Sequence, residues 1–136
     1  KIAEENAQTS GCKSVKFQEG DLFSPFCGKL RKKKFDLIIT NPPYIQTDVI
    51  PTLQREVKDH EPMSALDGGK DGLDFYRAIA ARWGAALRLG GALLFEVGIG
   101  QAGDVGAILA QNQFEQIQTF QDTQGIGRVV EGVLNS

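Results

Sequence analysis

The sequence predicts an α/β fold organised around a mainly parallel sheet. Two short runs of apolar and β-branched residues, Phe35–Thr40 and Ala92–Val97, have the composition of strands that are buried on both faces. The segment between them has one apolar face at helical spacing, formed by Leu73, Tyr76, Ala80, Trp83 and Leu87. Asp71 or Asp74 suits the amino end of this helix, and Leu89-Gly90-Gly91 suits its stop. Strand, helix and strand in this order form the crossover unit of a parallel sheet.

The flanking segments predict the remaining elements of the same fold. Upstream of the first strand, the pattern predicts the end of a helix over Lys1–Gln8 and a strand over Val15–Gln18. Downstream of the second strand, a helix is expected across residues 102–110. Two further strands, Phe114–Phe120 and residues 128–134, are joined by a short polar turn, which predicts a closing antiparallel hairpin.

The composition is that of an ordinary globular chain with a slight acidic excess. The 136 residues include 41% hydrophobic and 24% charged residues, and the net charge is −2. No apolar run has membrane-spanning length and there is no signal-peptide pattern. Cys12 and Cys27 are isolated thiols without metal-ligand spacing, which predicts a reducing cytoplasm and no metal site. Apart from the basic run at 31–34 there is no excess of positive charge, so direct nucleic-acid binding is not expected.

One tetrapeptide, Asn41-Pro42-Pro43-Tyr44, stands where the first predicted strand must end, because proline cannot donate to a sheet ladder. Ligands bind at the carboxyl ends of strands in open α/β folds. The nitrogen of an amide or aromatic amine is a poor nucleophile because its lone pair is delocalised. The Asn41 amide oxygen and a main-chain carbonyl of the Pro42-Pro43 unit can each accept one N–H of such a group, while Tyr44 stacks on its plane. The alternative is a proline-stiffened turn without chemistry.

A strand that ends in this tetrapeptide resembles the amino-group methyltransferases that use S-adenosylmethionine. Three segments that follow it, Glu61-Pro62, Ala65-Leu66 and Gly68–Leu73, are similar to the glutamine N5-methyltransferases of peptide chain release factors, the HemK/PrmC type. The similarity extends nearly to the end of the chain. It implies a Rossmann-like class I S-adenosylmethionine-dependent methyltransferase fold, and methyl transfer to a glutamine side-chain nitrogen of a release factor.

The resemblance also implies roles for individual residues. Asn41, Pro42 and Tyr44 match the catalytic positions, and together with Pro43 and Glu61 they would contact the substrate. Asp21 matches the acidic residue that accepts from the adenine amine of the cofactor, and Leu22 would lie beside the adenine ring. Asn41 would also contact the cofactor. Asp21 is equally consistent with an ordinary turn residue after a strand.

The family's catalytic domain starts with a strand, a glycine-rich cofactor loop and a second strand, and none of these has a counterpart before Lys1. Residues 1–136 are therefore expected to form a single partial catalytic domain that is inactive alone. In the family the first two strands lie between the third and the fourth, and the last strand lies between the fifth and the sixth. Without the first two, one edge of Phe35–Thr40 would be exposed, which predicts self-association through that edge.

Two other functions remain open at this point. A nucleic-acid methyltransferase that acts on the amino group of adenine or guanine uses the same tetrapeptide chemistry. The acidic balance and the Glu61–Leu73 similarity argue against it. The chain can also be a non-catalytic binding fragment that keeps a partner surface without cofactor chemistry.

Overall fold

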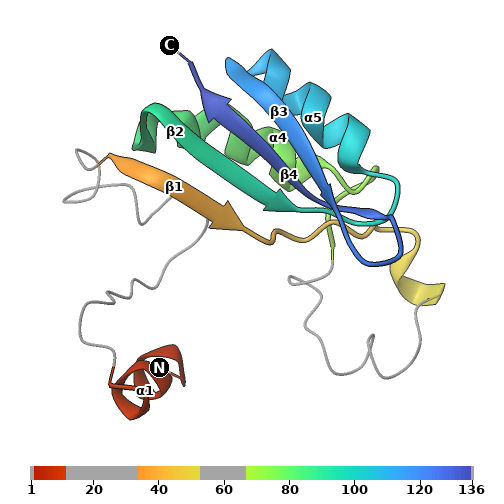
Figure 1. Ribbon diagram of the computed structural model, residues 1–136. Helices are drawn as coiled ribbons and strands as arrows, with labels where there is room; N and C mark the ends of the chain where they lie inside the picture. Colours follow the sequence, from red (N-terminus) through yellow and green to blue (C-terminus); the bar gives the residue numbers. More distant parts are fainter. Residues whose placement is uncertain (1, 12–33, 53–66, 136) are drawn as a thin grey trace. The chain divides into compact units, whose positions relative to one another are not determined.

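The computed structural model describes residues 2–11, 34–52 and 67–135 (Figure 1). The chain divides into two units, residues 1–33 and 34–136, and each is described by itself. In the first unit the described element is helix α1 (Ile2–Thr9), in agreement with the helix predicted over Lys1–Gln8. The predicted strand Val15–Gln18 lies outside the described residues.

The second unit contains a four-stranded mixed sheet in the order β1-β2-β4-β3. Strands β1 (Phe35–Thr40) and β2 (Leu87–Glu96) are parallel, as the crossover pattern predicts. Strands β3 (Phe114–Gln121) and β4 (Gly127–Leu134) form the predicted antiparallel hairpin, and β4 also pairs with β2. The last strand thus lies between its two predecessors, which is the arrangement that the family resemblance implies for the end of a class I methyltransferase sheet.

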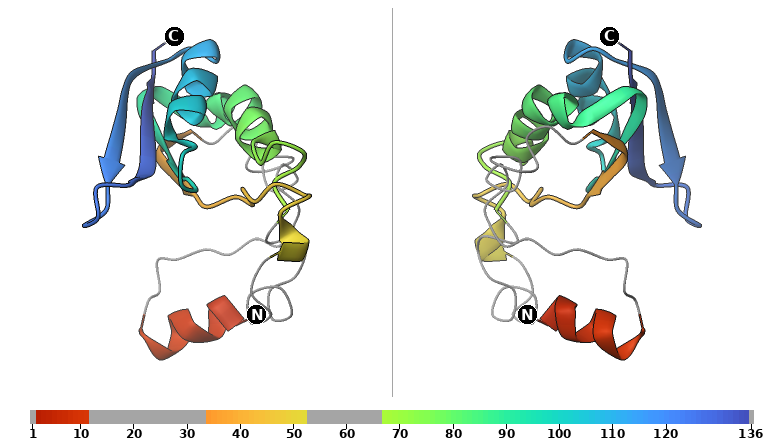
Figure 2. Two further views of the ribbon diagram at one scale, coloured as in Figure 1. Left: turned by 90° about the vertical axis from the view of Figure 1, so that its right-hand side faces the viewer. Right: turned by 90° about the vertical axis from the view of Figure 1, so that its left-hand side faces the viewer.

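Two helices cover one face of this sheet. Helix α4 (Asp74–Arg82) follows β1 and helix α5 (Ala102–Gln111) follows β2, and both lie on the same side of the strands (Figure 2). The core between them is apolar and its residues alternate along the strands, as expected for one covered face. Its fully buried side chains are Tyr76, Ile79, Leu93, Phe95, Val97, Val105, Leu109 and Val130.

Tyr76 is the one hydroxyl-bearing side chain among these fully buried residues, and its polar group has a partner. Its ring meets Phe95 edge-on, with ring centroids 5.0 Å apart. Its hydroxyl donates a hydrogen bond of 2.7 Å to the Glu96 carbonyl oxygen at the end of β2. Burial raises the pKa of Tyr76 well above its usual value, so the hydroxyl remains a donor throughout the neutral range. This hydrogen bond links α4 to the end of β2, which borders the site described below.

The helix between the parallel strands is shorter than its sequence pattern predicts. It ends at Arg82, continues as a 3-10 turn over Trp83–Ala86, and β2 begins at Leu87 rather than at Ala92. Gly90, at φ +84°, lies inside the strand, where the pairing jumps from Phe35↔Leu87 to Leu37↔Ala92. Gly90 and Gly91 therefore lie in an irregular stretch of the strand instead of forming a helix stop. Leu87 is buried in the strand and would also be buried in a longer helix. The spacing of apolar residues therefore could not distinguish a helix from a strand at this point.

The expectation that Phe35–Thr40 is buried on both faces is wrong for the described structure. Among the described strands β1 has a neighbour on one side only. Ile38 is 9% exposed, but Leu37 and Ile39 are 50% and 69% exposed. The apolar composition predicted the strand and its bounds correctly, whereas burial depends on elements that lie beyond the strand itself.

This edge leads to a prediction about the 136-residue chain by itself. A chain with an apolar edge strand is expected to self-associate, and Ile39→Lys is expected to shift it towards monomer because a charge on the edge opposes strand pairing. The mass in solution, measured by light scattering over a range of concentrations, tests this. Gln111→Lys, at an exposed residue of helix α5 and therefore in neither edge strand, is the matched control. A chain that stays monomeric at high concentration would contradict the prediction.

Candidate active site

The carboxyl ends of the two parallel strands place two short loops at one edge of the sheet. Asn41-Pro42-Pro43-Tyr44 follows β1, and Val97–Gln101 follows β2. Within the tetrapeptide, Asn41 is exposed, Pro42 is buried, and Pro43 and Tyr44 are partly buried. The Asn41 side chain is therefore open to a ligand, while the prolines that follow it are packed into the protein. The tetrapeptide directly follows β1, which confirms the strand end that the sequence predicted.

The ring of Tyr44 lies against the backbone of Gly98, at the end of the neighbouring strand. A Cβ atom at Gly98 would lie 2.7 Å from the Tyr44 Cδ2 atom and 2.9 Å from Cε2. Because real Cβ atoms do not approach other atoms so closely, this ring position requires glycine at residue 98. The glycine in the loop after β2 thus determines how closely the aromatic ring can approach the end of that strand.

The backbone of Pro43 and Tyr44 is enclosed by the glycine-rich segment 68–72. A Cβ atom at Gly68 would lie 2.7 Å from the Tyr44 Cα atom and 2.8 Å from the Pro43 carbonyl oxygen. The two segments are also joined by hydrogen bonds from the Gly68 N–H to the Ile45 carbonyl (2.7 Å) and from the Thr47 N–H to the Gly69 carbonyl (2.9 Å). The segment on which much of the family resemblance depends therefore holds the tetrapeptide in place.

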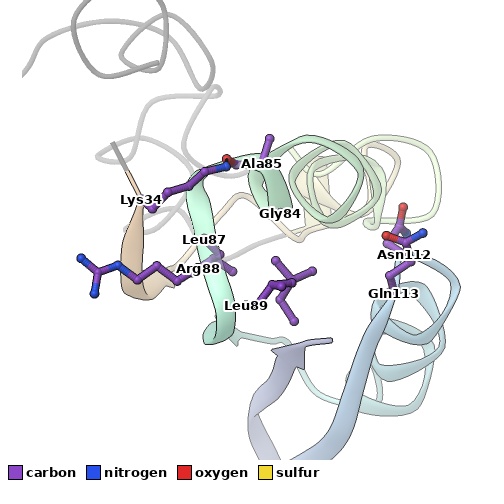
Figure 3. A pocket seen from close by; sticks show the side chains of 9 residues that line it. Lys34, Gly84, Ala85, Leu87, Arg88, Leu89, Asn112 and Gln113 are labelled. Atoms are coloured by element: carbon purple, nitrogen blue, oxygen red, sulfur yellow. Dashed lines mark hydrogen bonds between the residues drawn. The ribbon is translucent and has the colours of Figure 1, made fainter. Parts of the chain in front are cut away.

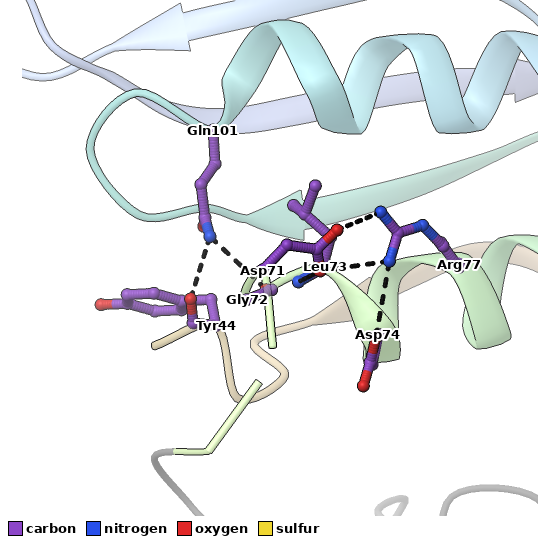
Figure 4. Close-up of polar contacts among 7 residues, drawn as sticks. All are labelled: Tyr44, Asp71, Gly72, Leu73, Asp74, Arg77 and Gln101. Carbon is purple, nitrogen blue, oxygen red and sulfur yellow. Dashed lines mark hydrogen bonds and ion pairs between the residues drawn. The ribbon is translucent and has the colours of Figure 1, made fainter. Parts of the chain in front are cut away.

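Gln101 connects three segments of the site, and the sequence analysis did not assign it a role. Its Nε2 donates to the Tyr44 carbonyl (2.9 Å) and to the Gly72 carbonyl (3.4 Å) (Figure 4). Its Oε1 accepts from the Gly98 N–H (2.9 Å). Gln101 is the N-cap residue of α5, yet its side chain makes no capping hydrogen bond. No local pattern in the sequence marks Gln101, because its contacts with Tyr44 and Gly72 join segments that are distant along the chain.

An ion pair secures the start of α4 beside this network. The Asp71 carboxylate accepts from the Arg77 guanidinium and, at 3.0 Å, from the Leu73 N–H. The Arg77 guanidinium holds the pKa of Asp71 below its usual range, and the Leu73 N–H acts in the same direction. Of the two carboxylates proposed for the helix start, Asp71 thus bonds the main chain, while Asp74 is a more distant partner of Arg77 at 3.5 Å.

The same edge of the sheet contains a cavity of about 340 Å³. Tyr44, Val49, Leu73, Gly98, Ile99 and Gln101 are among the residues that line it. A larger cavity of about 600 Å³ lies at the opposite end of β2, where Lys34, Arg88 and Gln113 line it (Figure 3). There Lys34 donates to the Ala85 carbonyl and Arg88 pairs with Asp36 at 3.3 Å. The cavity beside Tyr44 is the one that adjoins the predicted site.

The remaining predicted site residues, Asp21, Leu22 and Glu61, lie outside the described residues, so their roles stay predictions. Within the described ranges no three His, Cys, Asp or Glu residues gather in a way that could hold a metal ion. No helix within those ranges is long and apolar enough to cross a membrane. Arg128 pairs with Asp122 across the turn of the hairpin at 3.0 Å.

Two curated proteins with related sequences have the same description. The chain is 47% identical over 131 residues to a release factor glutamine methyltransferase from Geobacter sulfurreducens, covering 96% of this chain and 44% of that protein. It is 42% identical over 130 residues to the protein of the same description from Thermodesulfovibrio yellowstonii, covering 96% and 45%. The chain thus spans less than half the length of these relatives. No protein-family model matches it.

A solved structure gives the same result. It is the crystal structure of a release factor-specific protein-(glutamine-N5) methyltransferase from Alicyclobacillus acidocaldarius, which is 28% identical and has a TM-score of 0.50. The alignment covers 78% of this chain and 52% of that one. With the strand order, the position of Asn41–Tyr44 and the sequence relatives in agreement, the chain belongs to the release factor glutamine methyltransferase family.

Proposed function

We propose that this chain supplies the acceptor-binding half of an S-adenosylmethionine-dependent methyltransferase that modifies the side-chain amide nitrogen of a glutamine in a peptide chain release factor. The observation that supports this most is the position of Asn41–Tyr44. Asn41 is exposed at the end of a parallel strand, and the residues after it are enclosed by backbone on several sides. Such a site can hold an amide group in one orientation.

The proposed chemistry depends on orientation more than on a strong base. The Asn41 amide oxygen and the Pro42 carbonyl oxygen would each accept one N–H of the glutamine amide, and the Tyr44 ring would lie along the amide plane. These contacts would aim the nitrogen at the methyl group. On gaining the methyl group, the nitrogen would release one of its two protons to solvent. Alignment of this kind can contribute about 7–11 kcal/mol to lowering a barrier. When bound, S-adenosylmethionine supplies a methyl group on positively charged sulfur, which is already reactive.

Among the described residues, Asn41 is the one whose side chain fits S-adenosylmethionine. The exposed amide of Asn41 can accept a hydrogen bond at the strand end where the methyl group would have to arrive. Asp21 and Leu22 would hold the adenine, as the family resemblance implies. With a release factor as substrate, the protein would act in the cytoplasm, where translation takes place.

The test measures methyl transfer from labelled S-adenosylmethionine to two competing acceptors, a bacterial release factor and duplex DNA. The enzyme is a chimera in which this chain replaces the residues of the Geobacter sulfurreducens relative with which it aligns, and the 136-residue chain is assayed beside it. Label in the release factor from the chimera is the expected result. Label in DNA would instead support a nucleic-acid methyltransferase. Activity of the 136-residue chain by itself would show that it needs nothing upstream.

A further inference from the structure

We infer that Gln101 is a positioning residue for the proposed reaction, which orients the Asn41–Tyr44 loop through the Tyr44 carbonyl. The inference rests on the proposed function. Gln101 comes from a different part of the chain than the tetrapeptide, yet its side-chain amide bonds the main chain of Tyr44 directly. It touches neither the proposed acceptor nitrogen nor the methyl group, so it would act through the residues it holds.

The hydrogen bonds of Gln101 determine which way its amide points. The Gly98 N–H can bond only to an acceptor, which places the oxygen towards Gly98. The carbonyls of Tyr44 and Gly72 can bond only to donors, which places the nitrogen towards them. The two requirements agree, so the amide has a single favourable orientation. A side chain without both a donor and an acceptor cannot replace it.

The contacts restrain Tyr44 from two sides. Gln101 holds the carbonyl of Tyr44, and it also holds the N–H of Gly98, the residue on which the Tyr44 ring lies. Pro42 and Pro43 have fixed φ angles, so a shift of the Tyr44 peptide group would be transmitted along the loop to the Pro42 carbonyl. The Pro42 carbonyl is one of the two proposed acceptors of the glutamine N–H groups. Small errors in such positions reduce catalysis strongly.

A purely structural role at the start of α5 does not explain this arrangement. The first hydrogen bond of the helix runs from the Val105 N–H to the Gln101 main-chain carbonyl, which any residue at position 101 can supply. The side chain makes no capping bond to the helix. Its polar atoms are instead all directed to the loops after β1 and β2 and to the segment before α4. Loss of the side chain should therefore affect the site more than the helix.

The experiment uses Gln101→Glu in the chimera described above, with Gln124→Glu as a control of equal charge. Gln124 lies exposed in the hairpin turn. At about pH 8 the introduced carboxylate would face two carbonyl oxygens without a proton to donate, so kcat is expected to fall at least about tenfold. The KM for S-adenosylmethionine should change less than about threefold, because Gln101 itself makes none of the proposed cofactor contacts. Gln124→Glu should behave as the unchanged chimera.

The pH profile separates positioning from a general structural effect. Carbonyl oxygens raise the pKa of a neighbouring carboxyl group above its ordinary value of about 4.3. As the pH falls from about 8 to about 5.5, protonation restores one donor, so the activity of Gln101→Glu relative to the unchanged chimera should rise. Gln101→Met fills similar space without polar atoms and should be impaired at every pH. Melting temperatures, measured in parallel, show that each variant is folded.

Two results would overturn the inference while leaving the proposed function intact. One is a folded Gln101→Glu or Gln101→Met variant whose kcat equals that of the unchanged chimera. The other is a loss that appears in KM for the cofactor and not in kcat. By contrast, an unchanged chimera that is folded but transfers no methyl group to the release factor would refute the proposed function itself.

Discussion

Asn41→Ala is expected to lower kcat of the chimera by at least about 100-fold, with little change in the KM for S-adenosylmethionine. The substitution removes one of the two oxygens that would orient the glutamine nitrogen, and this contact matters most when the nitrogen attacks. Asn41 is exposed and follows the last residue of β1, so its side chain contributes little to packing. The variant should therefore remain folded.

Steady-state rates at varied cofactor concentration provide the measurement for Asn41→Ala. Asn135→Ala is a matched control, because Asn135 is also exposed and follows the end of a strand, where its amide donates to Glu115. Its kinetics should be close to those of the unchanged chimera. Equal losses in kcat and in cofactor binding for Asn41→Ala would contradict the role assigned to it, since the residue would then serve mainly to bind the cofactor.

Gly68→Ala is expected to abolish activity and to lower the melting temperature. A methyl group at this position would lie within 2.8 Å of the Tyr44 Cα atom, the Pro43 carbonyl oxygen and the Gly72 carbonyl oxygen. All three are backbone atoms, so no side chain can turn aside to make room. Overpacking of this kind typically lowers the free energy of unfolding by about 1–3 kcal/mol. Here the clash could be relieved only by movement of the tetrapeptide itself.

Gly103→Ala is the matched control for Gly68→Ala. Gly103 lies exposed in helix α5 and a Cβ atom there would meet nothing within 4 Å. Alanine favours helices over glycine by about 0.5–1 kcal/mol, so this variant should melt at the same temperature or slightly higher and keep its activity. A Gly68→Ala variant that melts and turns over like the unchanged chimera would show that the segment 68–72 does not enclose the tetrapeptide as described.

The parts of the fold that could be predicted are those with a local cause. The prolines after Thr40 end β1 at the predicted residue, and the polar turn before Arg128 produces the predicted hairpin. The end of α4 could not be predicted, because Gly90 and Gly91 suit a helix stop and an irregular stretch of strand equally well. The exposure of Leu37 and Ile39 depends on neighbours across the sheet, which no local pattern encodes.

The candidate site shows the same division between local and distant causes. Asn41-Pro42-Pro43-Tyr44 could be found because its chemistry and its place at a strand end are both visible in consecutive residues. Gln101 could not, because its role arises from hydrogen bonds to Tyr44 and Gly72, residues that are distant in sequence. The requirement for glycine at residues 68 and 98 likewise appears only when the tetrapeptide is packed against them.

The central claim is that this site presents a glutamine side-chain nitrogen for methylation. Tandem mass spectrometry of a release factor, incubated with S-adenosylmethionine and the chimera, tests it most directly because the spectrum locates the methyl group on one atom. We expect a single added methyl group on the side-chain nitrogen of one glutamine, and its absence with Asn41→Ala. A methyl group on any other residue, or an unmodified release factor after incubation with a folded chimera, would contradict it.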